Sequence, residues 1–346
     1  MSAGDVLLVS LGSTIGLRSA DEQLRASLER AGARVRLARA QAPRPVRTLM
    51  LTDLAWAHAA RRASGRALAA PADTSARPRA IIYSSTTAAL LWRVPGAIRF
   101  DAPAAANRAG RHGLWQRPLE QRRLRQAPLL LPWSEQALEE AAVGPELAAR
   151  ALVVPVAVKP SGALGGERDI TAITYAANPS KKGLDRVLQA WRELPAGDRG
   201  ELLVAGLEPR ELERALPGAS AVAGVRALGA LPRDHYRALL RRARVFVCAP
   251  RREDYGLAQL EALADGCMLV TTPAPGPYAA LALARSLDQR LVGEDLVGAL
   301  RAALEHPLPG YAARAQAALS PYRLRALDRL VSEQLLARLL GQRTQL

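Results

Sequence analysis

Two glutamates flank a glycine in one polar-to-apolar stretch, "REDYGLAQLEALADG" (252–266). Gly256 allows a close approach of the backbone to a ligand, and the apolar run after it predicts a helix over 257–264. The free N–H groups at the start of that helix favour a bound anion such as a diphosphate. Glu253 precedes this anion site and Glu261 lies one turn into the helix, so both carboxylates could accept hydrogen bonds from vicinal hydroxyls.

A pair of adjacent lysines is the second feature with chemical potential. Only three of the 48 basic residues are lysines, and Lys181 and Lys182 share a short loop between an expected strand and an expected helix. An ammonium group in such a loop can neutralise a phosphate. The alternative is a solvated loop charge, and this alternative fits Lys181 better than Lys182.

The histidines and cysteines carry no metal-binding pattern. The four histidines are scattered, and the two cysteines lie in separate apolar runs. We therefore expect no metal or other cofactor, and we expect two buried, reduced thiols.

Short apolar runs alternate with helical segments along the whole chain. The expected strands are 5–10, 34–39, 79–84, 96–100, 128–133, 151–156, 170–176, 201–206, 221–229, 243–249 and 267–272. This alternation predicts an α/β protein with two tandem doubly wound, Rossmann-like parallel-sheet domains. The carboxyl ends of the strands would then face an interdomain cleft.

The domain boundaries follow from the breaks in this alternation. We expect a first domain over 1–158, a glycine-containing linker over 157–169 and a second domain over 159–320. Residues 321–346 carry leucines and a valine at near-helical spacing, which predicts an amphipathic helix that needs a surface to cover.

The formal net charge of +16 is uneven, because residues 1–160 hold 23 basic and 12 acidic residues. Such an excess indicates an anionic partner: a phosphorylated substrate, a membrane surface or nucleic acid. Within 108–125, six arginines, one glutamate and interleaved apolar residues fit a surface that docks on anionic membrane. The alternative is a solvated helix whose arginine stems pack on the domain.

Other partners and locations are less well supported. No nucleic-acid motif is present and aromatic residues are few, which argues against nucleic acid. No apolar run is long enough to span a membrane, and the N-terminal stretch makes a poor signal peptide. We therefore expect a cytoplasmic protein.

The segment "EDYGLAQLEALADGCMLV" (253–270) resembles the Glu-x7-Glu signature of family 4 retaining glycosyltransferases, which have the GT-B fold. Other segments resemble the family in the same order along the chain: 127–141, 151–160, 175–191 and 225–250. The resemblance is close over 127–305 and weak over the first hundred residues.

The resemblance implies a role for each polar group of this region. Glu261 would hold the ribose hydroxyls of a nucleotide sugar, and Glu253 would contact the transferred sugar. Lys182 would neutralise the diphosphate, with Lys181 beside it. The backbone would meet the phosphates at three consecutive residues: Tyr255, Gly256 and Leu257.

The chain departs from the family pattern in two places. Members often carry an arginine where Ala176 and Ala177 stand, so phosphate neutralisation would also involve Arg251 or Arg252. Members also often carry a histidine where Phe100 stands.

Two further features of the first domain are candidates. Asp101 follows Phe100, and it would either orient a sugar hydroxyl or acceptor, or cap the next helix. The turn "LGSTIG" (11–16) would approach the ligand through Gly12 and Gly16, unless it is an ordinary strand–helix turn.

Together these features predict a cytoplasmic, metal-independent, retaining glycosyltransferase of the hexosyltransferase type (EC 2.4), peripheral at the inner face of the cell membrane. A nucleotide-diphosphate sugar would bind the second domain, and a sugar or lipid-linked acceptor would bind the first. By the same resemblance, the C-terminal helix would cross back to the first domain. Two alternatives remain: a nucleotide-sugar binder without turnover, and a nucleic-acid binder.

Overall fold

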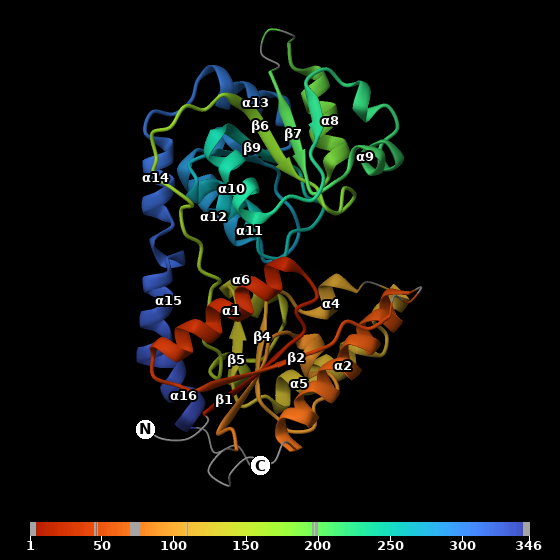
Figure 1. Cartoon of the computed structure of the whole chain (residues 1–346), viewed down its shortest axis with the longest axis vertical. Helices are drawn as coiled ribbons and strands as arrows, with labels where there is room; N and C mark the ends of the chain where they lie inside the picture. The colour runs from red at the N-terminus through yellow and green to blue at the C-terminus, as the bar shows by residue number, and fades with distance from the viewer. Residues whose placement is uncertain are drawn as a thin grey trace. The chain divides into compact units, whose positions relative to one another are not determined.

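The computed structural model describes residues 5–44, 46, 48–69, 77–108, 110–195, 197 and 200–341. They form two compact units. Val158–Pro321 is the second unit, and the chain up to Ala157 and from Tyr322 onward forms the first. Each unit contains a five-stranded sheet whose paired strands are all parallel (Figure 1). The predicted α/β class with two Rossmann-like parallel sheets is therefore confirmed.

The sheet of the first unit has the strand order β2-β1-β3-β4-β5. Its strands are β1 (Val6–Ser10), β2 (Val35–Arg39), β3 (Ala80–Tyr83), β4 (Ala97–Phe100) and β5 (Leu130–Pro132). Alternate residues of β1 enter two different apolar clusters, with Leu7 and Val9 on one face and Val6 and Leu8 on the other. Because both faces are covered, the strand reads as a continuous apolar run.

Helices from distant parts of the chain cover the two faces of this sheet. One face packs on α2 (Leu49–Ala69), α3 (Thr86–Ala89), α5 (Gln116–Gln126) and α6 (Glu135–Glu140). The other packs on α1 (Ile15–Arg30) and on the C-terminal segment, which consists of α15 (Leu324–Leu330), a π-helical turn Val331–Leu335 and α16 (Leu336–Gly341). The shorter helices are α4 (Ala104–Asn107), a 3₁₀ turn Gly110–Gly113 and α7 (Pro145–Ala148).

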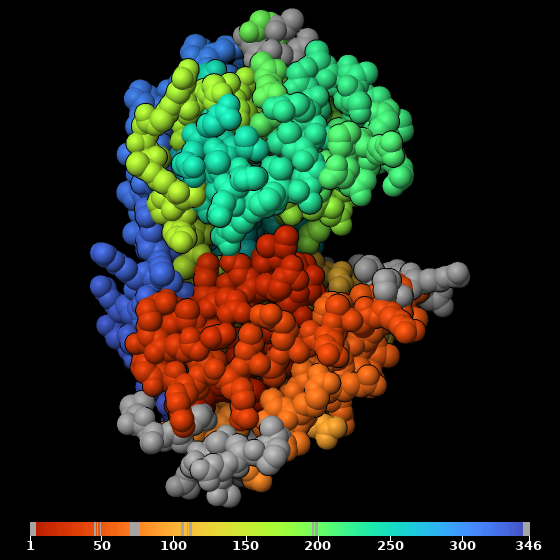
Figure 2. All heavy atoms as spheres, in the orientation of Figure 1, coloured from red at the N-terminus to blue at the C-terminus, as the bar shows by residue number. Residues whose placement is uncertain are grey.

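The C-terminal segment is part of the core of the first unit. Leu327, Val331 and Leu335 are buried in the same cluster as Leu24 of α1, and Asp328 accepts hydrogen bonds from Arg30 at 2.7 and 3.0 Å. α15 therefore lies beside α1, and both reach the surface there (Figures 1 and 2). An amphipathic helix with one apolar stripe is stable only where that stripe is covered, and here the sheet covers it.

The sheet of the second unit has the strand order β10-β9-β6-β7-β8. Its strands are β6 (Ile170–Tyr175), β7 (Leu202–Ala205), β8 (Val225–Ala227), β9 (Ala243–Cys248) and β10 (Met268–Thr271). Its helices are α8 (Leu184–Glu193), α9 (Pro209–Ala215), α10 (Arg233–Arg242), α11 (Leu257–Ala264), α12 (Ala279–Leu287), α13 (Leu296–Glu305) and α14 (Tyr311–Ala318). Of these, α8 packs with α13, and α10 packs with α11.

Each sheet has a point where the strand order reverses. In the first sheet it lies between β1 and β3, and in the second between β6 and β9. The connections on either side of such a point leave in opposite directions, which opens a crevice at the carboxyl ends of the two strands. The loops that follow β1 and β3, and those that follow β6 and β9, are therefore the places to look for ligand-binding side chains.

Two expectations about local structure were wrong. Residues 151–156 form no strand, and only a single bridge joins Ala151 to Leu130. The turn predicted over 11–16 ends earlier, because α1 begins at Ile15 and Thr14 caps it through the N–H of Leu17. Gly16 is therefore helical and not part of a turn.

The segment predicted to be a linker is attached to the second unit. Ser161 donates from its backbone N–H and from its hydroxyl to Asp265, at 2.7 and 3.0 Å. Arg168 donates to the carbonyl oxygens of Asp265 and Ala243.

The two cysteines, Cys248 and Cys267, are buried and free.

We predict that the covered leucines of the C-terminal segment stabilise the first unit. Leu335 is fully buried, so Leu335→Ala should lower the free energy of unfolding by about 2–5 kcal/mol. Leu324 is 38% exposed, and Leu324→Ala is the matched control, with a far smaller effect. Urea unfolding followed by circular dichroism measures both. Equal effects of the two substitutions would show that the segment contributes little to the core.

Candidate functional site

Two loops of the second unit are joined at the reversal point between β6 and β9. The backbone N–H of Arg251 donates to the carbonyl oxygen of Lys181 at 2.9 Å. Gly183 has φ of +62°, and a β-carbon there would lie only 1.8 Å from the carbonyl oxygen of Ala249. Only glycine fits both this backbone angle and this spacing, so Gly183 holds the loop after β6 against the loop after β9.

This junction brings Lys182 and Glu253 into direct contact. The ammonium of Lys182 lies 2.6 Å from Oε2 of Glu253, and the two side chains are 20% and 7% exposed. The amide of Gln259, on α11, donates to the same oxygen at 2.9 Å. The Glu253 carboxylate is therefore fixed from two sides, by a cation from one loop and by an amide from the helix.

The neighbouring charges form separate pairs. Lys181 lies 2.5 Å from Asp254, which also accepts from Arg252 at 3.0 Å. Arg251 makes a two-pronged pair with Asp185 at 2.6 and 2.8 Å, and both side chains are largely exposed. The four cations expected near a diphosphate thus lie on the same two loops, and Lys182 is the one that contacts Glu253.

The start of α11 lies directly after these charges. Gly256 is its N-cap with φ of +87°, and no side chain caps the helix. A β-carbon at Gly256 would lie 2.9 Å from the ring of Tyr278, so the backbone passes close to this ring. Tyr255 is buried, and Leu257 begins the helix. The helix dipole and its uncapped first turn favour an anion at this position.

Glu261 occupies a different environment from Glu253. Its Oε1 lies 2.5 Å from Arg233 and 3.5 Å from Arg237, both on α10. Among the described residues, Oε2 of Glu261 has no hydrogen-bond partner. Burial raises the pKa of the Glu261 carboxyl above its ordinary value, and the two arginines oppose this rise. The structure thus leaves one carboxylate oxygen of Glu261 able to accept a ligand hydroxyl.

Sequence reasoning missed the residues that hold the two glutamates. Arg237 is buried, and it also donates to Asp265 at 2.6 Å. Arg233 and Arg237 are four residues apart on α10, which places both on one helix face. One sequence feature could have indicated a partner for Glu253. Gln259 is a polar residue in the otherwise apolar run of the predicted helix, between the two glutamates.

The candidates of the first unit lie at the carboxyl end of its sheet. Asp101 follows β4, and its Oδ1 accepts the N–H of Ala102 at 2.9 Å. Asp101 does not cap the next helix, because the N-cap of α4 is Pro103 and Glu120 accepts the N–H of Ala104. Gly12 follows β1 with φ of +57°.

Gly12 and Gly16 differ in their surroundings. The carbonyl oxygen of Gly12 accepts from Arg18 at 2.9 Å, which closes the turn between β1 and α1. Gly16 lies in the first turn of α1. Gly12 therefore adopts the left-handed backbone conformation that favours glycine, as the sequence suggested, whereas Gly16 is helical.

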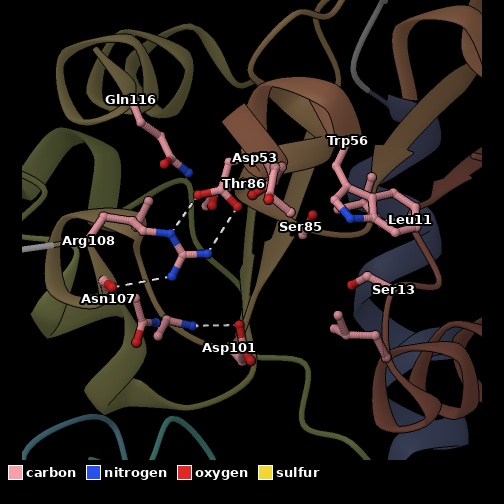
Figure 3. A pocket seen from close by; sticks show the side chains of 15 residues that line it. Leu11, Ser13, Asp53, Trp56, Ser85, Thr86, Asp101, Asn107, Arg108 and Gln116 are labelled. Atoms are coloured by element: carbon pink, nitrogen blue, oxygen red, sulfur yellow. Dashed lines mark hydrogen bonds and ion pairs between the residues drawn. The ribbon is translucent and has the colours of Figure 1, made fainter. Parts of the chain in front are cut away.

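A pocket of about 300 Å³ lies wholly within the first unit. Asp101 is one of its lining residues, and the others come from the loops after β1, β3 and β4 and from the helices α1 to α5 (Figure 3). Arg108 and Asp53 lie next to each other in its wall, joined by two hydrogen bonds of 2.5 and 3.0 Å (Figure 3). Sequence reasoning missed this pair, because Asp53 and Arg108 lie on separate elements.

The described residues hold neither a metal-binding cluster nor a membrane-spanning helix. No group of three or more histidine, cysteine, aspartate or glutamate side chains is arranged to hold a metal ion. No described helix is both long and apolar enough to cross a membrane.

Residues 168–308 match the protein family described as "Glycosyl transferases group 1". The matched residues contain both loops, α11 and the two glutamates. No curated protein matches the chain.

The whole chain has the GT-B fold of solved glycosyltransferases. WaaG, a glycosyltransferase involved in lipopolysaccharide biosynthesis, superposes with a TM-score of 0.72 at 15% identity, over 99% of this chain and 100% of that one. Sucrose-phosphate synthase from Thermosynechococcus elongatus superposes with 0.67 at 15%, over 99% and 100%. HepE from Anabaena, in complex with UDP and glucose, superposes with 0.69 at 13%, over 97% and 99%.

We predict that the junction between the two loops does not tolerate a side chain at Gly183. Gly183→Ala should lower the melting temperature of the second unit strongly, because the methyl group overlaps the carbonyl of Ala249. Gly310→Ala is the matched control: Gly310 is also a helix N-cap with φ of +70°, but nothing lies within 4 Å of its β-carbon position. The control should lose only about 1–2 kcal/mol, from the left-handed backbone. Thermal unfolding of both variants measures the difference, and equal losses would remove the packing argument.

Proposed function

We propose that the chain is a retaining hexosyltransferase that moves a sugar from a nucleotide-diphosphate sugar to an acceptor. The donor binds the second unit and the acceptor binds the first. The observation that carries this proposal is the contact of 2.6 Å between Lys182 and Glu253, at the reversal point of the second sheet. Retention is inferred from the likeness of 253–270 to the Glu-x7-Glu signature.

The contact between Lys182 and Glu253 suits the cleavage of the bond between the sugar and the diphosphate. In a nucleotide-diphosphate sugar, the anomeric carbon joins the sugar ring directly to a phosphate oxygen, so a group that serves the ring and one that serves the phosphate must be neighbours. Glu253 would orient the sugar and Lys182 would stabilise the departing diphosphate. The start of α11 would add its dipole to the same charge. In this proposal the protein's own cations balance the diphosphate, and no metal ion is required.

Glu261 would bind the ribose of the donor. Arg233 and Arg237 hold one oxygen of its carboxylate, which fixes the orientation of the other. A carboxylate held in this way accepts hydrogen bonds from ribose hydroxyls without first losing side-chain freedom. HepE, whose solved complexes hold UDP and UDP-glucose, supports a donor of this class.

A nucleotide-sugar binder without turnover is the second candidate. Phe100 is fully buried in the apolar cluster of the first sheet, and Ala176 is fully buried as well. Neither residue supplies the polar group that family members often have there. Assaying turnover with a panel of nucleotide sugars separates the two candidates, since a pure binder shows affinity and no product.

The acceptor side of the proposal includes a membrane. Within 108–125, Arg108 binds Asp53, Arg117 binds the carbonyl of Gly110, and Arg123 donates to Leu90 and packs over Trp92. Arg122 and Arg125 are exposed, as is Leu114 at 65%. We propose that these exposed residues dock the enzyme on the cytoplasmic face of an anionic membrane, where a lipid-linked acceptor would be found.

The two glutamates should separate binding from turnover. Glu261→Ala should weaken the affinity for the donor and for free UDP alike, by roughly 1.5–3 kcal/mol for a lost charged hydrogen bond. Glu253→Gln should leave the affinity for UDP nearly unchanged and lower kcat. Titration calorimetry with UDP and a donor-turnover assay give both numbers. Similar losses of UDP affinity in the two variants would contradict the assignment.

The two lysines form a natural pair of test and control. Each binds a carboxylate, at 2.6 Å for Lys182 and 2.5 Å for Lys181, but only Lys182 contacts Glu253. Lys182→Ala should lower kcat roughly a hundredfold or more, as for other lost groups that stabilise developing charge. Lys181→Ala should have a small effect. Steady-state kinetics decide, and a larger loss in Lys181→Ala would exchange the roles.

The membrane proposal predicts binding to anionic vesicles that weakens as salt rises. Arg122→Gln with Arg125→Gln should remove about 1 kcal/mol per arginine. Arg210→Gln with Arg214→Gln, on exposed α9, is the matched control. Co-sedimentation with phosphatidylserine and with phosphatidylcholine vesicles measures the effect. If the unaltered protein ignores both vesicles, a soluble acceptor replaces the lipid-linked one.

A further inference from the structure

The pocket of the first unit has the construction of a ligand site. It lies at the reversal point between β1 and β3, where an open parallel sheet offers its crevice. Its volume of about 300 Å³ is at the lower end for small-molecule pockets and suits a single small ring. Residues from five helices, α1 to α5, and from the loops after β1, β3 and β4 converge on it (Figure 3).

One wall of the pocket is polar and rigid. Asp53, whose side chain is 8% exposed, is held in a two-pronged pair with Arg108. Gln116 is 1% exposed, and its carbonyl oxygen Oε1 is buried without a hydrogen-bond partner in the described part of the chain. An unsatisfied buried acceptor is destabilising, and Gln116 lines the pocket. Turning the Gln116 amide toward the pocket would let Oε1 accept a hydrogen bond from a ligand hydroxyl and would relieve this cost.

The remaining surface of the pocket limits the charge of the ligand. Among the described residues, the charged groups that line it are two carboxylates, Asp53 and Asp101, and one guanidinium, Arg108. The single cation is already paired, so a phosphate or carboxylate ligand would meet a net negative wall. Leu11 and Trp56 come from the side opposite Arg108 and present apolar surface (Figure 3). An aromatic ring facing a polar wall matches a sugar, which has apolar C–H faces and a polar edge.

We propose that this pocket binds an uncharged sugar ring and that this ring is the acceptor. Vicinal hydroxyls would bridge Asp53 and Arg108, a third hydroxyl would donate to Gln116, and the C–H face would pack on Trp56. The identification of this ring as the acceptor rests on the proposed glycosyl transfer, whereas the assignment of a sugar site depends only on the pocket.

The test uses the full chain and a panel of methyl hexosides, with hexose 6-phosphates and hexuronates as charged counterparts. Saturation-transfer NMR should detect the uncharged hexosides without added nucleotide. Gln116→Leu, which preserves the side chain's size, and Asp53→Asn should each weaken hexoside binding about tenfold or more. Asp328→Asn is the matched control, because it alters another two-pronged arginine pair of the same unit, with Arg30. Unchanged melting temperatures and UDP affinity show that the variants are folded.

Three results would overturn the inference: no hexoside binding up to the solubility limit, equal binding by the wild type and both pocket variants, or tighter binding of the charged sugars. The nucleotide measurement separates this failure from failure of the proposed function. If UDP binds and hexosides do not, only the pocket assignment is lost. If hexosides bind with the predicted sensitivity and UDP does not, glycosyl transfer is lost and a sugar-binding pocket remains.

Discussion

The close approach of two backbone segments governs the site of the second unit. Gly183 faces the carbonyl of Ala249 at a spacing that excludes any side chain, and the Arg251 N–H binds the Lys181 carbonyl. These contacts exist because β6 and β9 are adjacent although about 70 residues separate them in the chain. Lys182 and Glu253 meet only because the backbone around them does. The topology of the sheet and the backbone contact at Gly183 therefore place Lys182 beside Glu253.

Each sheet has a reversal point in its strand order, but the side chains around the two points differ in their chemistry. At the β6–β9 reversal the loops supply cations, two carboxylates and an uncapped helix N-terminus, which suits a diphosphate. At the β1–β3 reversal the loops supply hydroxyls, while α2 and α5 supply a paired carboxylate, an amide oxygen and apolar surface, which suits a neutral ring. Two units with one architecture therefore differ in what they can hold because the loops and helices around these points differ.

The sequence predicted well those features that depend on local pattern. The bounds of α11 agree with the helix predicted over 257–264 and with Gly256 and Gly266 at its ends. The prediction of a strand over 151–156 was wrong, because an apolar run resembles a strand whether or not a neighbouring strand pairs with it along its length. Long-range pairs could not be seen at all. Arg108 appeared to belong to a basic surface, whereas its guanidinium binds Asp53, 55 residues earlier.

The position of the C-terminal segment has a consequence for the order in which the protein folds on the ribosome. The second unit is continuous in the chain, but the first is not: residues 322–341 are synthesised after all of the second unit, and they cover an apolar face formed by Val6, Leu8 and Leu24. Until then, α1 covers that face of the sheet only in part. The second unit can therefore reach its native state while the first, although begun earlier, is still incomplete. The nascent chain must keep this apolar face from aggregating for the whole of that interval.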